Sequence, residues 1–381
     1  MRNEFDDIRP YYDSELPASM CRIANNPLFA IIASYLFPEE PVAALCEKLL
    51  SLKSVYEFQT QIMQRVNDRI TEKTISHFSY GGFDVIDRNK AYLFVANHRD
   101  IMLDAALLQN IMIKNDVPTS QITFGANLMT SEIVVDIGRS NKMFRVERPS
   151  SDLRKFYYAS EHLSKYIRHT LVEQNESVWI AQRNGRTKDG LDRTDRGVIN
   201  MFRMSCQDDK VRSIAELNIL PVTVSYEWEP CDIQKACEIY ATRRGPYQKS
   251  ADEDLKSILS GITSHKGRVH FEFSQPITAE ELAQFAEYPS QKFNVAVAVL
   301  VDSRICSAYR LWPNNYIAHD MLSGTDAYAS EYSAEEKLRF VEHLERCEST
   351  LPEEYDREEI REIMLGIYAN AVDSKNIFVA R

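Results

Sequence analysis

A short apolar run that leads through a polar turn into a helix constrains this sequence more than any other stretch. Tyr92–Ala96 has the composition of a buried strand, and Ala105–Leu108 reads as part of an amphipathic helix. Asn97 and His98 fall at the corner between them, where a side chain faces solvent or a ligand. This corner predicts an α/β fold and makes His98 a candidate catalytic residue.

Two aspartates follow the histidine closely enough to hold its ring. Asp100 and Asp104 are both candidates for this contact. An imidazole held by a carboxylate is the usual general base for a hydroxyl proton near neutral pH. The structural alternative is a surface histidine in a helix-capping turn, with Asn97 or Asp100 as the cap.

The composition is that of a folded globular protein with an acidic balance. Of the 381 residues, 44% are hydrophobic, and the formal net charge is −11. A sizeable core is therefore expected, and a nucleic-acid partner is not. The seven cysteines show no CxxC pair and no metal-ligand spacing, so we expect reduced thiols and no bound metal.

The sequence predicts neither a secretory signal peptide nor a membrane-spanning helix. The apolar segment Pro27–Phe37 is too short for a bilayer, which requires about 20 residues. This segment is expected to pack as a core helix or, alternatively, to insert into a membrane surface. We expect the protein in the cytoplasm. If the segment inserts into a membrane surface, we expect peripheral attachment to the inner face of the cell membrane.

The hydrophobic pattern divides the chain into three regions. Residues 1–75 are predicted as an N-terminal helical region, 76–324 as an α/β domain and 325–381 as a C-terminal helical appendage. The expected strands are Phe83–Ile86, Tyr92–Ala96, Gln121–Phe124, Ser177–Ala181, Ile219–Tyr226 and Val269–Phe273. The expected helices of the α/β domain are Asp104–Ile113, Asp152–Gln174, Val198–Cys206, Ile233–Thr242, Asp252–Ser264 and Phe293–Ala308.

Three further stretches follow the His98 corner in the chain. The first runs from Gly125 to Arg148, the second is Val178–Gly190 (VWIAQRNGRTKDG), and the third is Ile219–Glu227 (ILPVTVSYE). Taken in order with NHRDIMLD, they resemble the four sequence blocks of the glycerophospholipid acyltransferases. This family includes the glycerol-3-phosphate and lysophosphatidate acyltransferases. The resemblance covers roughly residues 80–230.

The resemblance implies a fold and a reaction. The fold is a central mixed sheet flanked by helices, with helical appendages at both ends. The reaction, a step of phospholipid biosynthesis, moves a fatty acyl group from acyl-CoA or an acyl carrier protein (acyl-ACP) to the hydroxyl of a glycerol-phosphate-type lipid precursor. His98 would be the general base and Asp104 the acid that stabilises its cationic form. The expected partners are the acyl carrier, the lipid precursor and a membrane surface, without a bound cofactor.

The resemblance also implies an anion site. Arg148 and Arg145 of the second block would bind the head group of the acceptor, and Gly185 and Arg186 would form a substrate-binding turn. Arginine's planar fork suits phosphate or carboxylate, and arginines cluster in both blocks of this acidic chain. The alternative is a set of solvated faces whose cations pair with neighbouring acids.

Two positions depart from the family pattern. Five residues separate His98 from Asp104, whereas the family has four. A loop would absorb the extra residue, but a regular helix would turn Asp104 by about 100° and favour Asp100 as the partner. Arg183 stands where the family commonly has a glutamate, which favours an acceptor with a different or additional anionic group.

Two other functions stay open. An O-acyltransferase that acts on a lyso-aminolipid would suit Arg183. A non-catalytic lipid-binding protein could keep the same fold. The sequence contains no Walker loop and no Gly-x-Ser-x-Gly motif, so a covalent serine mechanism is disfavoured.

Overall fold

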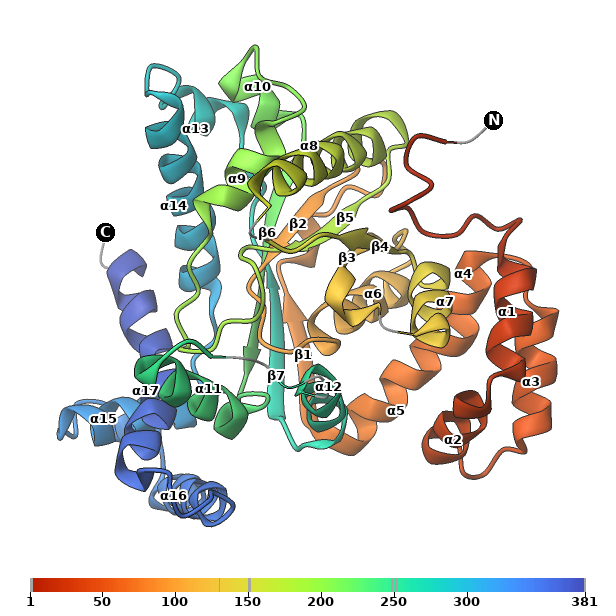
Figure 1. The fold of residues 1–381 in the computed structure, drawn as a ribbon. Helices are drawn as coiled ribbons and strands as arrows, with labels where there is room; N and C mark the ends of the chain where they lie inside the picture. The colour runs from red at the N-terminus through yellow and green to blue at the C-terminus, as the bar shows by residue number, and fades with distance from the viewer. Residues whose placement is uncertain (1–2, 130, 150–151, 248–249, 251–252, 380–381) are drawn as a thin grey trace.

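The protein is built around a seven-stranded mixed sheet in the order β1-β7-β6-β2-β5-β3-β4 (Figure 1). The computed structural model describes residues 3–379 except 130, 150–151, 248–249 and 251–252. The strands are β1 (Ile75–Gly81), β2 (Leu93–Ala96), β3 (Gln121–Gly125), β4 (Met143–Val146), β5 (Val178–Ala181), β6 (Ile219–Tyr226) and β7 (Gly267–Phe273). The predicted α/β fold with a central mixed sheet is confirmed.

The strands β2, β3, β4, β5 and β6 run in the same direction. β2 pairs in parallel with β5 and β6, and β3 pairs in parallel with β5 and β4. β7 is antiparallel to β6 and parallel to β1. Because the carboxyl ends of parallel strands meet at one edge of a sheet, the loops after these co-directional strands open on the same side. This edge is where open α/β sheets commonly bind ligands.

Helices cover both faces of the sheet. They are α6 (Leu103–Lys114), α7 (Glu132–Ser140), α8 (Leu153–Arg168) with the π-helical turn η4 (His169–Glu173), α9 (Arg196–Arg203), α10 (Lys210–Ala215), α13 (Ala279–Ala283) and α14 (Ser290–Ala308). In β2, Leu93 and Val95 belong to the core under α8, α9 and α14, whereas Phe94 and Ala96 belong to the core under α6. A strand covered on both faces requires such a continuous apolar run.

The N-terminal helices form a unit at the right of Figure 1. They are α1 (Leu16–Asn25), α2 (Pro27–Leu36), α3 (Val42–Ser51), α4 (Val55–Phe58), the π-helical turn η1 (Gln59–Met63) and α5 (Gln64–Thr74). Leu16, Met20, Leu49 and Phe58 form part of a small core of this unit. None of the described helices combines the length and the apolar character that crossing a membrane requires.

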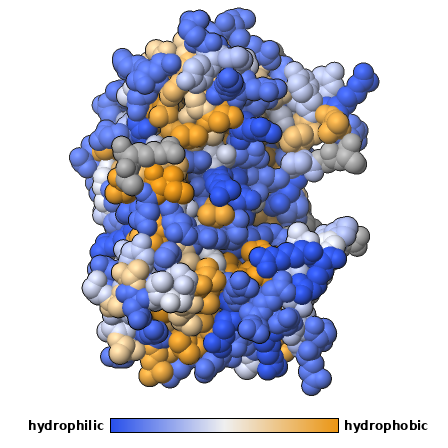
Figure 2. All heavy atoms as spheres, turned by 90° about the vertical axis from the view of Figure 1, so that its left-hand side faces the viewer, coloured by the Kyte–Doolittle hydropathy of each residue, from blue (hydrophilic) through white to orange (hydrophobic). Residues whose placement is uncertain are grey.

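The connection from β6 to β7 contains α11 (Asp232–Arg244) and α12 (Glu253–Thr263). Three further α-helices follow α14. These are α15 (Pro313–Ser323), α16 (Ala334–Ser349) and α17 (Arg357–Val379), at the lower left of Figure 1. They share a hydrophobic core with α11, to which Phe340, Ile363 and Met364 contribute. On this side of the molecule, apolar side chains form separate patches among polar ones (Figure 2).

The structure differs from the predicted elements mainly at the sheet margins. The expected strand at Phe83–Ile86 is wrong, because Phe83–Val85 is a 3-10 turn that follows Gly82 at φ +68°. The strand lies earlier instead, as β1, and β4 was not predicted. The expected helix at Asp252–Ser264 corresponds to α12, and Asp252 itself lies outside the described residues.

Candidate active site

His98 lies two residues beyond the end of β2, at the edge where the carboxyl ends of the co-directional strands meet. Its side chain is 14% exposed, and its ring stands edge-on to Trp179 of β5 with the centroids 5.6 Å apart. Its Nδ1 atom is 2.8 Å from Oδ2 of Asp104. The ring therefore contacts an acid on one side and remains partly open on the other.

The carboxylate of Asp104 accepts hydrogen bonds from three further donors. The backbone N–H groups of Arg99 and Asp100 donate to Oδ2 at 2.6 and 2.9 Å, and the Tyr226 hydroxyl donates to Oδ1 at 2.7 Å. Because the other three partners of this carboxylate are all donors, we assign the proton of the shared bond to Nδ1 of His98. Nε2 then keeps its lone pair and can act as a base.

The Tyr226 hydroxyl is a permanent donor in this arrangement. Tyr226 is the last residue of β6 and is 1% exposed. Burial, reinforced by the neighbouring carboxylate of Asp104, holds the pKa of Tyr226 well above its usual value. The phenol therefore stays protonated and keeps stabilising the ionised form of Asp104.

Asp100 has a different role from Asp104. Its Oδ1 accepts the backbone N–H groups of Met102 and Leu103, both at 2.9 Å, and so caps the turn that enters α6. On its other side it lies against Gly261 of α12, where an added Cβ would be 2.5 Å from Oδ2. Because α6 begins at Leu103, the extra residue of the His98–Asp104 spacer is absorbed in a turn rather than in helix.

The third and fourth blocks fix the backbone around the histidine. The carbonyl of His98 accepts the N–H of Thr187 at 2.7 Å. The side chain of Asn97 bonds to both the carbonyl and the N–H of Val224 in β6, at 3.0 and 2.7 Å, and also donates to Asp192 at 3.0 Å. The corner is thus tied to β6 and to the loop that follows β5.

Arg148 follows β4 and lies between the second and third blocks. Its Nε donates to Oδ1 of Asn127 at 2.7 Å. Its Nη1 lies beside Gly185, 3.8 Å from where a Cβ of that residue would be. Gly185 has φ +75°, a conformation that favours glycine, so this turn can approach the guanidinium closely.

Arg183 and Arg186 extend this cationic region from the loop after β5. Both are partly buried, and neither forms a hydrogen bond or ion pair with any residue that the structure describes. Nη1 of Arg186 is fully enclosed without a hydrogen-bond partner. Among the same residues, Arg148 bonds only to a neutral amide. Three cations that meet no described carboxylate, in a chain of net charge −11, form a site suited to an anion.

The structure does not bring Arg145 into this group. Its guanidinium forms an ion pair with Glu147 at 2.6 Å. It lines a hollow beside α8 together with Asp7 and His162. The position of Arg145 therefore supports an anion-binding role less well than the positions of the other three arginines do.

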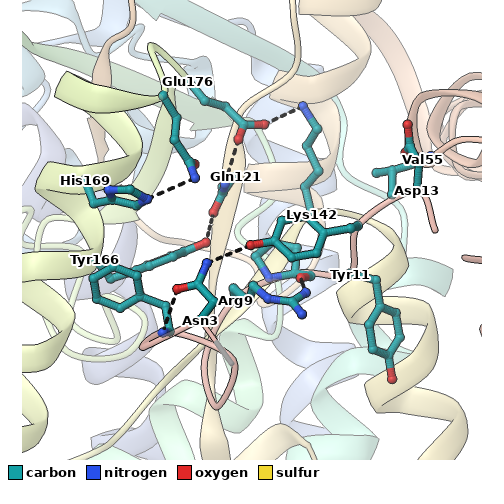
Figure 3. A pocket seen from close by; sticks show the side chains of 14 residues that line it. Asn3, Arg9, Tyr11, Asp13, Val55, Gln121, Lys142, Tyr166, His169 and Glu176 are labelled. Atoms are coloured by element: carbon teal, nitrogen blue, oxygen red, sulfur yellow. Dashed lines mark hydrogen bonds and ion pairs between the residues drawn. The ribbon is translucent and has the colours of Figure 1, made fainter. Parts of the chain in front are cut away.

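A hollow at the opposite edge of the sheet is lined by the N-terminal segment (Figure 3). Gln121 begins β3, and Glu176 precedes β5, so this hollow faces the amino ends of these strands. Its polar groups pair with each other: Tyr166 donates to Gln121 at 2.5 Å, and Lys142 contacts Glu176 at 2.7 Å. It is separate from the edge that carries His98.

Among the described residues, one group has donor atoms close enough for a metal ion. It consists of Asp232, His343 and Cys347, whose ligand atoms lie within 4.8 Å of one another. Nε2 of His343 is already 2.6 Å from Asp232, and Tyr368 donates to the same carboxylate oxygen at 2.7 Å. These contacts account for the group as a hydrogen-bonded cluster of the C-terminal helices.

The sequence carries a family signature over the region that contains this site. Residues 77–225 match the model of the family described as Acyltransferase. The match extends from β1 into β6 and therefore includes His98, Asp104, Arg148 and Arg186. No curated protein matches the sequence. Among solved structures, the chain is similar to the crystal structure of the 1-acyl-sn-glycerophosphate (LPA) acyltransferase, PlsC, from Thermotoga maritima, with 14% identity and a TM-score of 0.37, over 76% of this chain and 95% of that chain.

The match to the Acyltransferase model covers the region of the four blocks, as the resemblance predicted. His98 and Asp104 meet at the corner after β2, and Arg148 meets the Gly185 turn. The sequence reasoning missed Tyr226. A tyrosine inside a fully buried strand must place its hydroxyl against a polar partner, and this was the available signal.

Proposed function

We propose that the protein moves a fatty acyl group from acyl-CoA or acyl-ACP to the hydroxyl of a glycerol-phosphate-type lipid precursor. One observation carries this proposal. A histidine held by a carboxylate lies at the same sheet edge as three arginines that have no acidic partner among the described residues. A base for the acceptor hydroxyl and a site for its phosphate are the two features that such a reaction requires.

The reaction follows from the orientation of His98. Nδ1 donates to Asp104, so Nε2 removes the proton of the acceptor hydroxyl as its oxygen attacks the thioester carbonyl. The tetrahedral intermediate then breaks its carbon–sulfur bond. The departing thiolate takes the proton back from the imidazolium, which yields the ester and a free thiol. Asp104 stabilises the imidazolium between these steps, and no acyl-enzyme forms.

The arginines supply binding and positioning for the acceptor. A phosphate between Arg148 and Arg186 would satisfy guanidinium donors that meet no acidic partner in the described part of the chain, including the enclosed Nη1 of Arg186. Charge-assisted bonds of this kind contribute about 1.5–3 kcal/mol each. Holding the acceptor at a fixed point also places its hydroxyl next to the base, which is a large part of catalysis by proximity.

A second acceptor class is favoured by one residue. Arg183 is partly buried without an acidic partner among the described residues, at a position where the family commonly has a glutamate. An acceptor with a different or additional anionic group, such as a lyso-aminolipid, would match it. If the acceptor is a lyso-aminolipid, the variant Arg183→Glu should shift acceptor selectivity toward glycerol 3-phosphate. Unchanged selectivity would contradict this second acceptor class.

We propose that α2 attaches the protein to the membrane that holds its product. Its exposed residues Leu28, Ile31, Ile32 and Tyr35 are 43–66% exposed and follow the spacing of one helix face. The helix contains no charged residue, and an apolar face of this kind inserts into the boundary between head groups and acyl chains. In vesicle flotation, Ile31→Asp should abolish co-flotation, whereas Leu338→Asp on α16, which alters another exposed leucine, should not.

The decisive experiment compares thiol release from an acyl thioester by the wild type and by His98→Ala. We expect the variant to be slower by about 10²–10⁴-fold when an acceptor is present. His162→Ala is the control, because His162 is a partly exposed histidine of α8 that pairs with Asp7 of the N-terminal segment. Equal background release by the wild type and His98→Ala with every acceptor would favour a non-catalytic lipid-binding protein.

A further inference from the structure

Four charged side chains are buried directly beneath the turn that carries His98. Arg99 and Lys235 are 1% and 2% exposed, and Asp192 and Glu229 are 5% and 6% exposed. Arg99 contacts Asp192 at 2.6 Å and Glu229 at 3.1 Å, and Lys235 contacts Glu229 at 2.6 Å. Two cations and two anions thus balance one another away from water.

Stability alone is a poor reason for such a cluster. Removing charges from water costs more than a buried pair commonly returns, and apolar residues of similar size often stabilise a fold equally well. Burial opposes the charge of Arg99, but the carboxylates of Asp192 and Glu229 outweigh it and hold the Arg99 pKa well above its usual value. The Arg99 guanidinium therefore stays charged, and the contacts of the cluster indicate what it does.

Those contacts reach the backbone and side chains on both sides of His98. Nζ of Lys235 donates to the carbonyl of Arg99 at 2.8 Å. Asp192 accepts from the side chains of both Asn97 and Arg99, at 3.0 and 2.6 Å. The residues that precede and follow the histidine are thus anchored to the same four charges.

The C-terminal helix α17 supports the cluster from outside the region that matches the Acyltransferase model. The Tyr368 hydroxyl accepts the N–H of Glu229 at 3.1 Å and donates to Asp232 of α11 at 2.7 Å. Gly190, whose carbonyl accepts from the Arg99 guanidinium at 3.3 Å, packs directly on α17. An added Cβ at Gly190 would lie 2.0 Å from the carbonyl oxygen of Ile367, so α17 and this loop are in contact.

We propose that Lys235 and Glu229 are positioning residues for His98, and that α17 braces them through Tyr368. This inference rests on the proposed function of His98 as the base. The cluster limits movement of the turn, so Nε2 keeps its direction toward the acceptor hydroxyl. Displacement of a reacting group by about 1 Å can lower a rate by roughly 10²-fold, so bracing of this kind has a measurable effect.

The test uses the full chain with Lys235→Met and Glu229→Gln combined. This pair removes one cation and one anion, so the remaining Arg99 and Asp192 still balance each other. We expect kcat to fall by about 10–100-fold because His98 loses its fixed orientation. The KM for the acceptor should not change, because the anion-binding arginines are untouched. In proton NMR, the resonance of the His98 Nδ1 proton shared with Asp104 should broaden or disappear.

A matched control removes an ion pair elsewhere in the C-terminal helices. Arg361 of α17 contacts Glu348 of α16, with the Nη2–Oε2 distance at 2.8 Å. The variant Arg361→Met with Glu348→Gln likewise removes one cation and one anion, without reaching the cluster. We expect it to keep the wild-type kcat and the Nδ1 resonance. If the Lys235 and Glu229 double variant matches this control in both readouts, the positioning role is wrong.

If the double variant fails to fold, Tyr368→Phe tests the proposal instead. It keeps the ring and removes only the hydroxyl, and we expect a loss of about 3–10-fold in kcat with a weakened Nδ1 resonance. Wild-type values for both would overturn the bracing by α17. If the wild type and His98→Ala transfer no acyl group, the proposed function fails. The NMR readout then tests the bracing on its own, and an unchanged resonance in Tyr368→Phe would overturn it.

Discussion

The two halves of the site differ in how their polar atoms are satisfied. Around Asp104, each carboxylate oxygen meets donors from the protein itself, from His98, Tyr226 and two backbone N–H groups. Around Arg148 and Arg186, the guanidinium groups meet no carboxylate among the described residues. The polar atoms of the first half have their partners without a ligand, whereas the guanidinium groups of the second half do not.

This difference shows how the two tasks are divided. A base must hold its direction before the acceptor arrives, so its orientation is set by bonds within the fold. An anion site that paired its arginines internally would have to break those pairs in order to bind. Unpaired cations avoid that cost, and the ligand supplies the opposite charge. Substitutions in the two halves should therefore have different consequences for rate, binding and stability.

The largest effect should come from Asp104→Asn, compared with Asp100→Asn. The first variant removes the charge that stabilises the imidazolium and directs an amide N–H₂ toward existing donors, so we expect kcat to fall by about 10³–10⁴-fold. The second keeps an acceptor oxygen for the N–H groups of Met102 and Leu103 and should retain activity within about 3-fold. Steady-state kinetics measure both, and equal losses would show that the assignment of Asp104 over Asp100 is mistaken.

A smaller effect is expected in the anion site. Arg148→Gln and Arg186→Gln should each raise the KM for a phosphate-bearing acceptor by about 10–100-fold, because each removes a charge-assisted bond to the ligand. Arg145→Gln is the control, since Arg145 pairs with Glu147, and it should remain near the wild type. A drop in kcat without a change in KM would place these arginines outside acceptor binding.

Removal of the Tyr226 hydroxyl should have a modest effect. Tyr226→Phe leaves Asp104 with three of its four donors, so we expect kcat to fall by about 3–10-fold. The raised pKa of Tyr226 means that the phenol loses no proton as the pH rises from neutral to moderately alkaline. The ratio of wild type to variant should therefore be the same at pH 7 and pH 9, and a ratio that converges at high pH would show that the hydroxyl ionises.

The smallest effects should appear in thermal unfolding. Without ligand, Arg186→Gln should change the free energy of unfolding by at most about 0.5 kcal/mol, because the Arg186 side chain bonds to none of the residues that the structure describes. Asp104→Asn should cost about 1–3 kcal/mol, because it disturbs a buried network. Inorganic phosphate at 100 times its Kd should stabilise the wild type by about 2.7 kcal/mol. Equal stabilisation of Arg186→Gln by phosphate would contradict the anion site.

Much of the sheet could be predicted because its central strands are apolar runs. β2, β5 and β6 are almost wholly buried, and their composition reveals them. β1 and β4 lie at the two ends of the sheet, where only one of seven residues of β1 and two of four residues of β4 are buried, and the signal weakens. β1 also continues directly from α5, so no turn marks its start.

The site could be predicted only where its residues lie in local motifs. His98, Arg148 and Arg186 belong to blocks with a recognisable order. The choice between Asp104 and Asp100 depended on whether the spacer was a turn, which the sequence left open. Tyr226 and Lys235 were out of reach because their partners, Asp104 and Arg99, are 122 and 136 positions away in the chain.

The contact between Gly190 and Ile367 has a consequence for protein engineering. The segment that carries the family signature ends well before α17, yet one of its loops rests on that helix without room for a single methyl group. Grafting residues 77–225 into another protein would transfer the reactive groups. The loop that contains Gly190 would then lose the helix on which it packs. A functional chimaera should therefore exchange the signature segment and the last helix together.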